Sequence, residues 1–380
     1  MSEHQIVVIG ASFAGLTVSH NLLKDIIPAI PKQKFKVVQV APSDQFYFKI
    51  AAPRVLINPQ SLPLEKALID FKKTFSGYSA EQYQFIKASA TSIDPATKTV
   101  KLSNESSVKY DSLVICSGTY FDNDLWSTAR GEEPLKAAIK DLHEKLPKAE
   151  TIVIGGGGAA GTETAGELGD LYGSKKDITL YSGTSQLLNN LNNKAVGKDA
   201  EQRLLKQGIK VQHNIQITSH RSEGGKEVLQ LSNGETKTVD VYIGAVGDRP
   251  STSFVPKEWL DDKNRVLTDP QTLRLSVDGV RGVYVYGTAA SYSNGSIADV
   301  MFAKKAILET LKNDLAGNEP APRTKNVYKK ITSDMQFVPV GSTQGVGIAF
   351  GWKVPSFMVK MAKSKDFMIG NASKVVAGNS

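Results

Sequence analysis

Two glycine-rich runs are the strongest chemical signal in the sequence. The first comprises Gly10, Ala11, Ser12, Ala14 and Gly15, and the second, about 145 residues later, comprises Gly156, Gly158 and Gly161. In the fingerprint G-x-G-x-x-G, the glycines allow a tight turn, close approach of a diphosphate and close packing of the following helix. The second run satisfies the fingerprint, whereas the first has Ser12 at the middle glycine. One copy alone could be a plain glycine-rich turn, but two copies favour dinucleotide binding.

Each glycine run lies between an apolar strand and a helix. The pattern predicts two βαβ units. The first has strand 6–9, a helix to about residue 27 and strand 35–40. The second has strand 151–154, a helix to about residue 171 and strand 177–181. Further buried-strand runs end within 110–118, 239–247 and 282–290. The sequence therefore predicts an α/β fold with two Rossmann-like nucleotide-binding domains.

Composition and charge exclude several other classes. The chain has 380 residues, a net charge of +8 and a single cysteine, Cys116, which excludes an internal disulfide or a redox-active cysteine pair. The five histidines show no metal-ligand spacing, so no metal site is expected. The basic residues form no compact run, which makes nucleic acid an unfavoured partner. No apolar run is long enough to span a bilayer, and the short N-terminus before the first strand leads us to expect a cytoplasmic protein.

Taken together, these motifs resemble the two-dinucleotide-binding flavoprotein family. Within that family they are similar to the apoptosis-inducing-factor-like branch, which includes ferroptosis suppressor protein. The elements that carry the resemblance are the paired fingerprints, the strand end 110–118, the run 247–250, the Tyr286-Gly287 end and the tail 345–366. The resemblance implies a glutathione-reductase-like fold of two three-layer ββα domains. It places an FAD domain at 1–125 and 245–315, an NAD(P)H domain at 126–244 and a small α+β C-terminal domain at 316–380 that covers the flavin.

The resemblance also implies a set of cofactor-binding residues. FAD would be held by Gly10, Ala11, Ser12, Ala14, Gly15, Gln39, Arg54, Ala90, Ser117, Gly118, Gly247, Gly287 and Thr288. NADH or NADPH would be held by Gly156, Gly158, Gly161, Glu163 and Ser182, with Glu163 positioning the nicotinamide. The alternative for Glu163 is a carboxylate that only complements the helix dipole.

Three positions depart from the family pattern by lacking a carboxylate. Gln39 stands where an acidic residue usually binds the FAD ribose, and Thr288 replaces an aspartate near the flavin. Ser182 lies at the end of the second-domain strand, where a carboxylate would favour NADH. The last change gives a mild preference for NADPH or for use of both nucleotides.

The electron acceptor is inferred from the missing cysteine pair. Without an internal dithiol, the resemblance favours a quinone, although a protein electron carrier or a biosynthetic substrate stays open. A dinucleotide-binding signalling or cell-death protein with incidental turnover is the alternative from another class. Segment 350–363 mixes aromatic residues, methionines and lysines, which fits either peripheral membrane contact or packing of the C-terminal domain. Cys116 is expected to be a small buried side chain, and the oligomeric state is left open.

Overall fold

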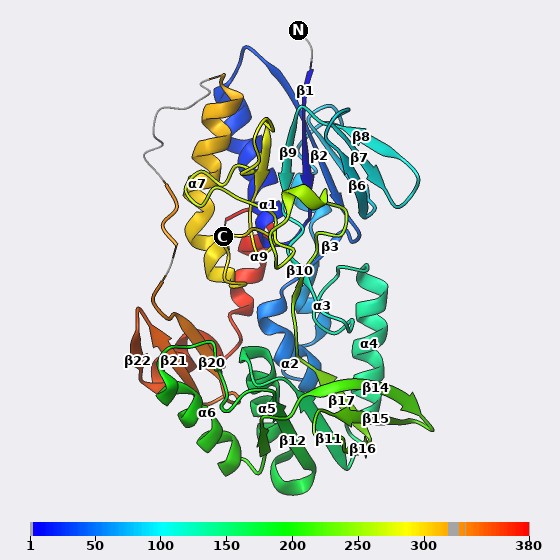
Figure 1. The fold of residues 1–380 in the computed structure, drawn as a ribbon, viewed down its shortest axis with the longest axis vertical. Coiled ribbons are helices and arrows are strands. Elements are labelled where there is room, and N and C mark those ends of the chain that lie inside the picture. Colours follow the sequence, from blue (N-terminus) through cyan, green and yellow to red (C-terminus); the bar gives the residue numbers. More distant parts are fainter. Residues whose placement is uncertain (1–2, 318–326, 331, 380) are drawn as a thin grey trace.

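The computed structural model describes residues 3–317, 327–330 and 332–379. Its first domain is built on a five-stranded parallel sheet of order β19-β9-β1-β2-β5 (Figure 1). The strands are β1 (Glu3–Ile9), β2 (Lys34–Ala41), β5 (Tyr83–Lys87), β9 (Ser112–Ile115) and β19 (Val283–Val285). The central strands are continuous apolar runs because both faces of this sheet are covered.

Helices cover one face of this sheet and an antiparallel meander covers the other (Figure 1). The helices are α1 (Phe13–Asn21), which continues as a π-helical turn (Leu22–Ile26), and α7 (Ile297–Leu315). The meander consists of β6 (Ala90–Asp94), β7 (Thr99–Leu102) and β8 (Ser107–Lys109). Two short antiparallel strands, β3 (Gln45–Tyr47) and β4 (Leu68–Asp70), and two short helices, α2 (Ala52–Ile57) and α3 (Leu64–Ala67), complete this part.

The second domain repeats the same plan with a four-stranded parallel sheet of order β13-β12-β11-β17. Its strands are β11 (Thr151–Gly155), β12 (Asp177–Ser182), β13 (Lys210–His213) and β17 (Val241–Gly244). Its helices are α4 (Glu132–Lys145), α5 (Ala159–Tyr172) and α6 (Lys194–Lys206), and its meander is β14 (Ile217–Glu223), β15 (Lys226–Leu231) and β16 (Thr236–Val239). Two strands that pair with each other, β10 (Thr119–Tyr120) and β18 (Arg249–Pro250), lie where the chain leaves and re-enters the first domain.

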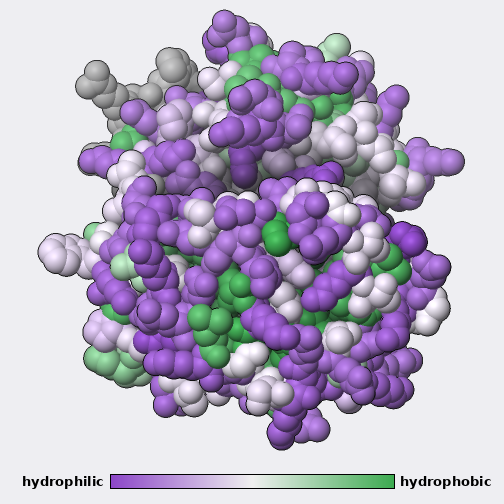
Figure 2. All heavy atoms as spheres, turned by 60° about the horizontal axis from the view of Figure 1, so that its bottom comes forward, coloured by the Kyte–Doolittle hydropathy of each residue, from purple (hydrophilic) through white to green (hydrophobic). Residues whose placement is uncertain are grey.

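The C-terminal part packs against both nucleotide-binding domains. It contains the antiparallel strands β20 (Gln336–Pro339), β21 (Gly345–Ala349) and β22 (Trp352–Val354) and the helices α8 (Ser356–Val359) and α9 (Ala372–Val376). Strand β20 packs on α5 and β21 on α6, while α9 packs on α1. The face in Figure 2 is mostly hydrophilic with scattered hydrophobic areas, and a recess separates its upper and lower masses.

The predicted α/β class and the two βαβ units are confirmed, and the main differences are at element ends. Helix α1 ends at Asn21 rather than near residue 27, because a π-helical turn and a 3-10 turn (Ile27–Ala29) follow it. Strand β2 runs on to Ala41. This longer strand changes which of its residues reach the candidate site.

Candidate functional site

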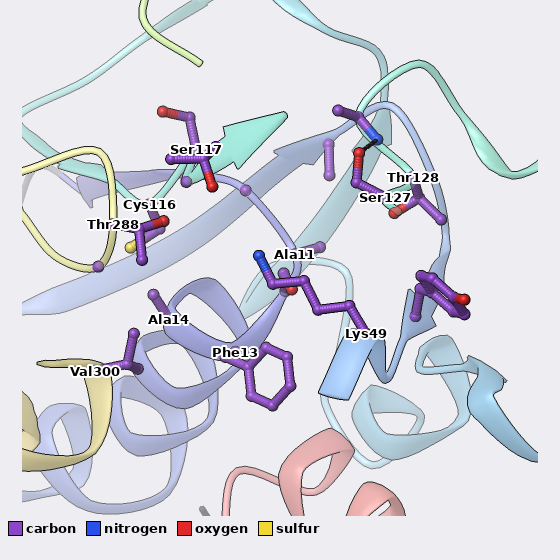
Figure 3. Close-up of a pocket in the computed structure, with 18 of the residues that line it drawn as sticks. Ala11, Phe13, Ala14, Lys49, Cys116, Ser117, Ser127, Thr128, Thr288 and Val300 are labelled. Atoms are coloured by element: carbon purple, nitrogen blue, oxygen red, sulfur yellow. Dashed lines mark hydrogen bonds between the residues drawn. The ribbon is translucent and has the colours of Figure 1, made fainter. Parts of the chain in front are cut away.

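A pocket opens at the carboxyl edge of the first sheet. The chain enters it directly after β1, β2, β9 and β19, so four strand ends supply its wall. The sheet order changes direction between β1 and β9, and this switch point is where open α/β sheets bind their ligands. A second wall comes from the loop 126–129 before α4, and Figure 3 shows Ser127 and Thr128 there.

Eight of the thirteen residues predicted for FAD line this pocket. They are Gly10, Ala11, Ser12, Ala14, Ser117, Gly118, Gly287 and Thr288. Gly10 has φ +115°, and a Cβ there would lie 2.3 Å from the carbonyl oxygen of Cys116. Gly15 lies behind the loop, where a Cβ would lie 1.9 Å from the carbonyl oxygen of Gly10. The two glycines therefore bring helix α1 against the turn and direct its N-terminus at the pocket.

The other predicted FAD residues lie elsewhere. Gln39 is fully buried, donates from Nε2 to the carbonyl of Gly10 at 2.9 Å and accepts from the Tyr83 hydroxyl at 2.8 Å. It supports the glycine loop from behind, because β2 continues for two residues and residues 41–43 reach the pocket instead. Ala90 begins the meander strand β6, and Gly247 is exposed; neither lines the pocket.

Arg54 is also absent from the pocket wall, and its guanidinium group lies at a domain junction. Its Nε and Nη2 donate to Glu167 Oε2 and Oε1, each at 2.8 Å, with both side chains 3% exposed. Arg54 also donates to the carbonyls of Ser364 at 2.8 Å and Lys365 at 2.7 Å. One side chain of the first domain thus connects the second domain with the C-terminal segment.

Two polar groups in the pocket wall have no hydrogen-bond partner among the described residues. They are the Tyr47 hydroxyl and the Ser117 Oγ, both inaccessible to solvent. Burial raises the pKa of Tyr47, so this hydroxyl stays a donor. The N-cap residue of α1, Ser12, makes no side-chain cap, which leaves the first amides of the helix available. These unsatisfied donors fit a cofactor that contains a diphosphate and hydroxyl groups.

The second glycine loop reproduces the geometry of the first. Gly156 has φ +122°, and a Cβ on Gly161 would lie 1.9 Å from the carbonyl oxygen of Gly156, the same distance as in the first copy. Gly158 is the N-cap of α5 and faces open space. Ser182 lies under this loop, where its Oγ contacts Thr184 Oγ1 at 3.1 Å. A Cβ on Gly157 would lie only 2.4 Å from that Oγ.

Glu163 lies near the start of α5 and is 4% exposed. Lys363, from the π-helical turn after α8 (Lys360–Ser364), donates to Glu163 Oε1 at 2.5 Å and to the carbonyl of Phe337 at 3.3 Å. Burial raises the pKa of Glu163 to about 7, and the Lys363 ammonium opposes that rise. One turn later, burial also raises the pKa of Glu167, and Arg54 opposes it. Helix α5 therefore directs two buried carboxylates toward cations of the other two domains.

The sequence-based interpretation missed residues at strand ends, in a turn and in a loop that carry no motif. These are Ala41, Pro42, Ser43, Tyr47, Lys49 and the loop 126–129, together with Lys363 as the partner of Glu163. A lone tyrosine at a strand end or a lone lysine in a turn has no spacing signal, and only the tertiary fold selects it. Cys116 also lines the pocket and is 4% exposed, and burial raises its thiol pKa.

No helix between residues 3 and 379, leaving out the undescribed stretches, is long and apolar enough to cross a membrane. The same residues contain no cluster of three or more histidine, cysteine, aspartate or glutamate side chains suited to a metal ion.

Comparisons with known proteins agree with this geometry. The family model for pyridine nucleotide-disulphide oxidoreductases matches residues 4–310. Oxidoreductase phnG of Penicillium herquei is 30% identical over 405 residues, which cover 99% of this chain and 97% of that protein. Ferroptosis suppressor protein 1 of Xenopus tropicalis is 26% identical over 384 residues, covering 97% and 95%.

Among solved structures, the sulfide:quinone oxidoreductase of Aquifex aeolicus has the same fold, with a TM-score of 0.72 at 17% identity over 99% of this chain and 92% of that one. The glutathione-reductase-like fold and the resemblance to the ferroptosis-suppressor branch are thereby confirmed. The chain belongs to the pyridine nucleotide-disulphide oxidoreductase family.

Proposed function

We propose that this chain is an FAD-dependent oxidoreductase that takes hydride from NADH or NADPH and reduces a quinone-type acceptor. The observation that carries the proposal is the pair of glycine loops with a buried ion pair between their domains. The first loop faces a pocket with unsatisfied donors, and the second faces open space at the start of α5. Bound FAD would supply hydride acceptance from the nicotinamide and electron transfer to the acceptor.

The protein's own part is to position the two nucleotides. The amides at the start of α1 and α5 would each bind a diphosphate, and the Ser117 and Tyr47 hydroxyls would bind polar groups of the first cofactor. Glu163 and Lys363 form a polar contact at the junction of the domains. There the carboxylate would orient the nicotinamide, while the C-terminal segment excludes water.

The acceptor is proposed from the cysteine content and the C-terminal surface. One buried cysteine provides no dithiol to relay electrons, which leaves small acceptors that reach the flavin directly. The structural neighbour from Aquifex aeolicus is named for a quinone, which supports this class. Trp352, Met361, Phe350 and Phe357 are 81%, 77%, 67% and 63% exposed. We propose that this surface contacts a membrane from which a lipid-soluble quinone is drawn.

The test is an absorbance spectrum of the purified protein followed by anaerobic titration. We expect a flavin spectrum, bleaching by NADH or NADPH, and recovery of the oxidised spectrum when a short-chain ubiquinone is added. A matched Glu163→Gln sample should retain the flavin spectrum and bleach more slowly. A protein that stays colourless after reconstitution with FAD would contradict the proposal. If the flavin is bleached but no quinone reoxidises it, the reduction by NADH or NADPH stands and the quinone as acceptor is rejected.

A further inference from the structure

Lys49 is the one charged side chain among the described residues that line the FAD-type pocket. It begins the 3-10 turn Lys49–Ala51 that leads into α2. Figure 3 shows its side chain extending across the pocket toward Ala11, at the glycine loop. None of the hydrogen bonds or ion pairs within the described chain involves its ammonium group.

An unpaired ammonium inside a pocket is electrostatically costly. Burial lowers the pKa of Lys49, and the charge of Asp248 raises it. Asp248 belongs to an exposed loop and does not line the pocket. The pocket wall contains no carboxylate, so nothing in it competes for the cation. Lys49 is half-buried, and a cation in such a pocket without a partner is stabilised when an anion binds next to it.

The groups across the pocket select the class of anion. Helix α1 directs its uncapped N-terminus into the same space, and its dipole also favours negative charge. The Ser117 Oγ and Tyr47 hydroxyl provide two more donors that lack partners. A dinucleotide diphosphate carries two negative charges, whereas an oxidised flavin ring is neutral. The helix terminus and the ammonium together therefore match the diphosphate better than the ring.

We propose that Lys49 binds the diphosphate of the dinucleotide held in this pocket, together with the N-terminus of α1. The proposal rests on the proposed function, because it takes the ligand to be a dinucleotide. Ser12 replaces the middle glycine, which would allow close approach of the diphosphate. In this proposal, the attraction between Lys49 and the diphosphate compensates for that replacement. The residue acts in cofactor binding and takes no part in hydride transfer.

The experiment compares FAD affinity of the apoprotein, its Lys49→Met and Lys49→Arg variants, and a Lys66→Met control. Lys66 is an exposed lysine on α3 that does not line the pocket, so the Lys66→Met variant tests the loss of one positive charge elsewhere on the surface. We expect Lys49→Met to raise the FAD Kd by about tenfold or more, with a difference that shrinks as salt increases. Lys49→Arg should stay close to the wild type, and thermal melting of the apoproteins checks that each variant folds.

Two readouts separate the diphosphate from the flavin ring. The flavin midpoint potential should be the same in the wild type and in Lys49→Met, because a cation at the diphosphate does not contact the ring. An unchanged FAD Kd in Lys49→Met overturns the proposal. A changed midpoint potential with an unchanged Kd also overturns it, because that result places Lys49 at the ring.

A flavin-free probe separates this proposal from the proposed function. ADP-ribose binding is measured in a Gly158→Glu background, in which a carboxylate at the N-cap of α5 repels diphosphates from the second loop. If this protein binds ADP-ribose and not FAD, the proposed function fails. Weaker ADP-ribose binding after Lys49→Met then still supports Lys49, and equal binding overturns its role. If neither probe binds, both proposals are overturned.

Discussion

At the scale of single residues, the buried carboxylate of Glu163 is the feature with the clearest consequences. It lies one helical turn from Glu167, and its charge is balanced by Lys363, which lies 200 residues further along the chain. A carboxylate whose only use is to complement the helix dipole has no need for burial or for a lysine partner. The geometry therefore favours the role in nicotinamide positioning.

Replacing Glu163 by Gln is expected to slow flavin reduction by NADH or NADPH about tenfold to hundredfold, because a misplaced nicotinamide loses its alignment for hydride transfer. Stopped-flow absorbance measures the rate. The flavin content should stay unchanged, because Glu163 belongs to the second nucleotide domain. Glu133→Gln, which alters an exposed carboxylate of α4, serves as the control. Equal reduction rates in all three proteins would reject the positioning role.

The raised pKa of Glu163 predicts a pH-dependent cost to stability. Between its ordinary pKa of 4.5 and the folded value of about 7, the folded state holds a proton that the unfolded state has released. Its contribution to stability therefore falls as the pH rises through this window. Relative to the wild type, Glu163→Gln should become more stable by up to about 3 kcal/mol between pH 5 and pH 8. Urea unfolding measures this difference, and a difference that is constant with pH would contradict the shift.

At the scale of elements, α5 joins the three parts of the molecule. Its N-terminus carries the second glycine loop, Glu167 binds Arg54 of α2, and β20 packs along it. A Cβ on Gly166 would lie 2.6 Å from the amide nitrogen of Gly341, so the C-terminal part approaches this helix closely. The position of α5 therefore decides how the first domain and the C-terminal segment meet.

Breaking the Arg54 pair is expected to be costly. Arg54→Met leaves the Glu167 carboxylate buried without its partner, which should lower the free energy of unfolding by about 3 to 5 kcal/mol. The double variant Arg54→Met, Glu167→Met should recover much of that loss, because no unpaired charge remains. Chemical denaturation of the four proteins forms the cycle. Arg221→Met, in an exposed pair with Glu223, should leave the stability unchanged. Additive losses would show that the pair is not coupled.

At the scale of the whole molecule, the C-terminal part presents its apolar side chains in two ways. Val359 and Phe367 are fully buried, whereas Trp352, Phe357 and Met361 are largely exposed. For segment 350–363, the sequence was compatible either with packing of the C-terminal domain or with contact to a membrane. In the structure, some residues of this part are buried in the packing and others are exposed. Lys353 and Lys360 lie among the exposed residues, so the surface combines aromatic, apolar and basic groups.

A Trp352→Ala, Met361→Ser double variant is therefore expected to lose binding to vesicles that contain anionic lipid, because it removes the two most exposed of the large apolar side chains that the structure describes. Co-sedimentation measures the bound fraction, with neutral vesicles as the electrostatic comparison. Phe302→Ser, which removes an exposed apolar side chain of α7, is the matched control. If the wild type does not sediment with anionic vesicles, the membrane part of the proposal is wrong.

The two nucleotide-binding units could be predicted from the amino-acid pattern alone. Strand periodicity and the glycine spacing are local signals, and they predicted β1, β11 and the two loops. The family resemblance, in turn, implied eight of the residues that line the pocket. The ends of helices and strands and the partners of side chains were harder to predict from the sequence. Gln39 was expected at the cofactor, but β2 continues for two residues beyond it, and its side chain lies under the glycine loop instead.

The contacts between side chains far apart in the chain became visible only in the folded molecule. Arg54 pairs with a carboxylate 113 residues away, Lys363 with one 200 residues away, and Lys49 enters the pocket from a turn without a motif. Such contacts depend on how three domains pack, and packing leaves no periodic trace in the chain. The local pattern therefore predicts what binds, whereas the charges that tune binding and reduction are set by the assembled fold.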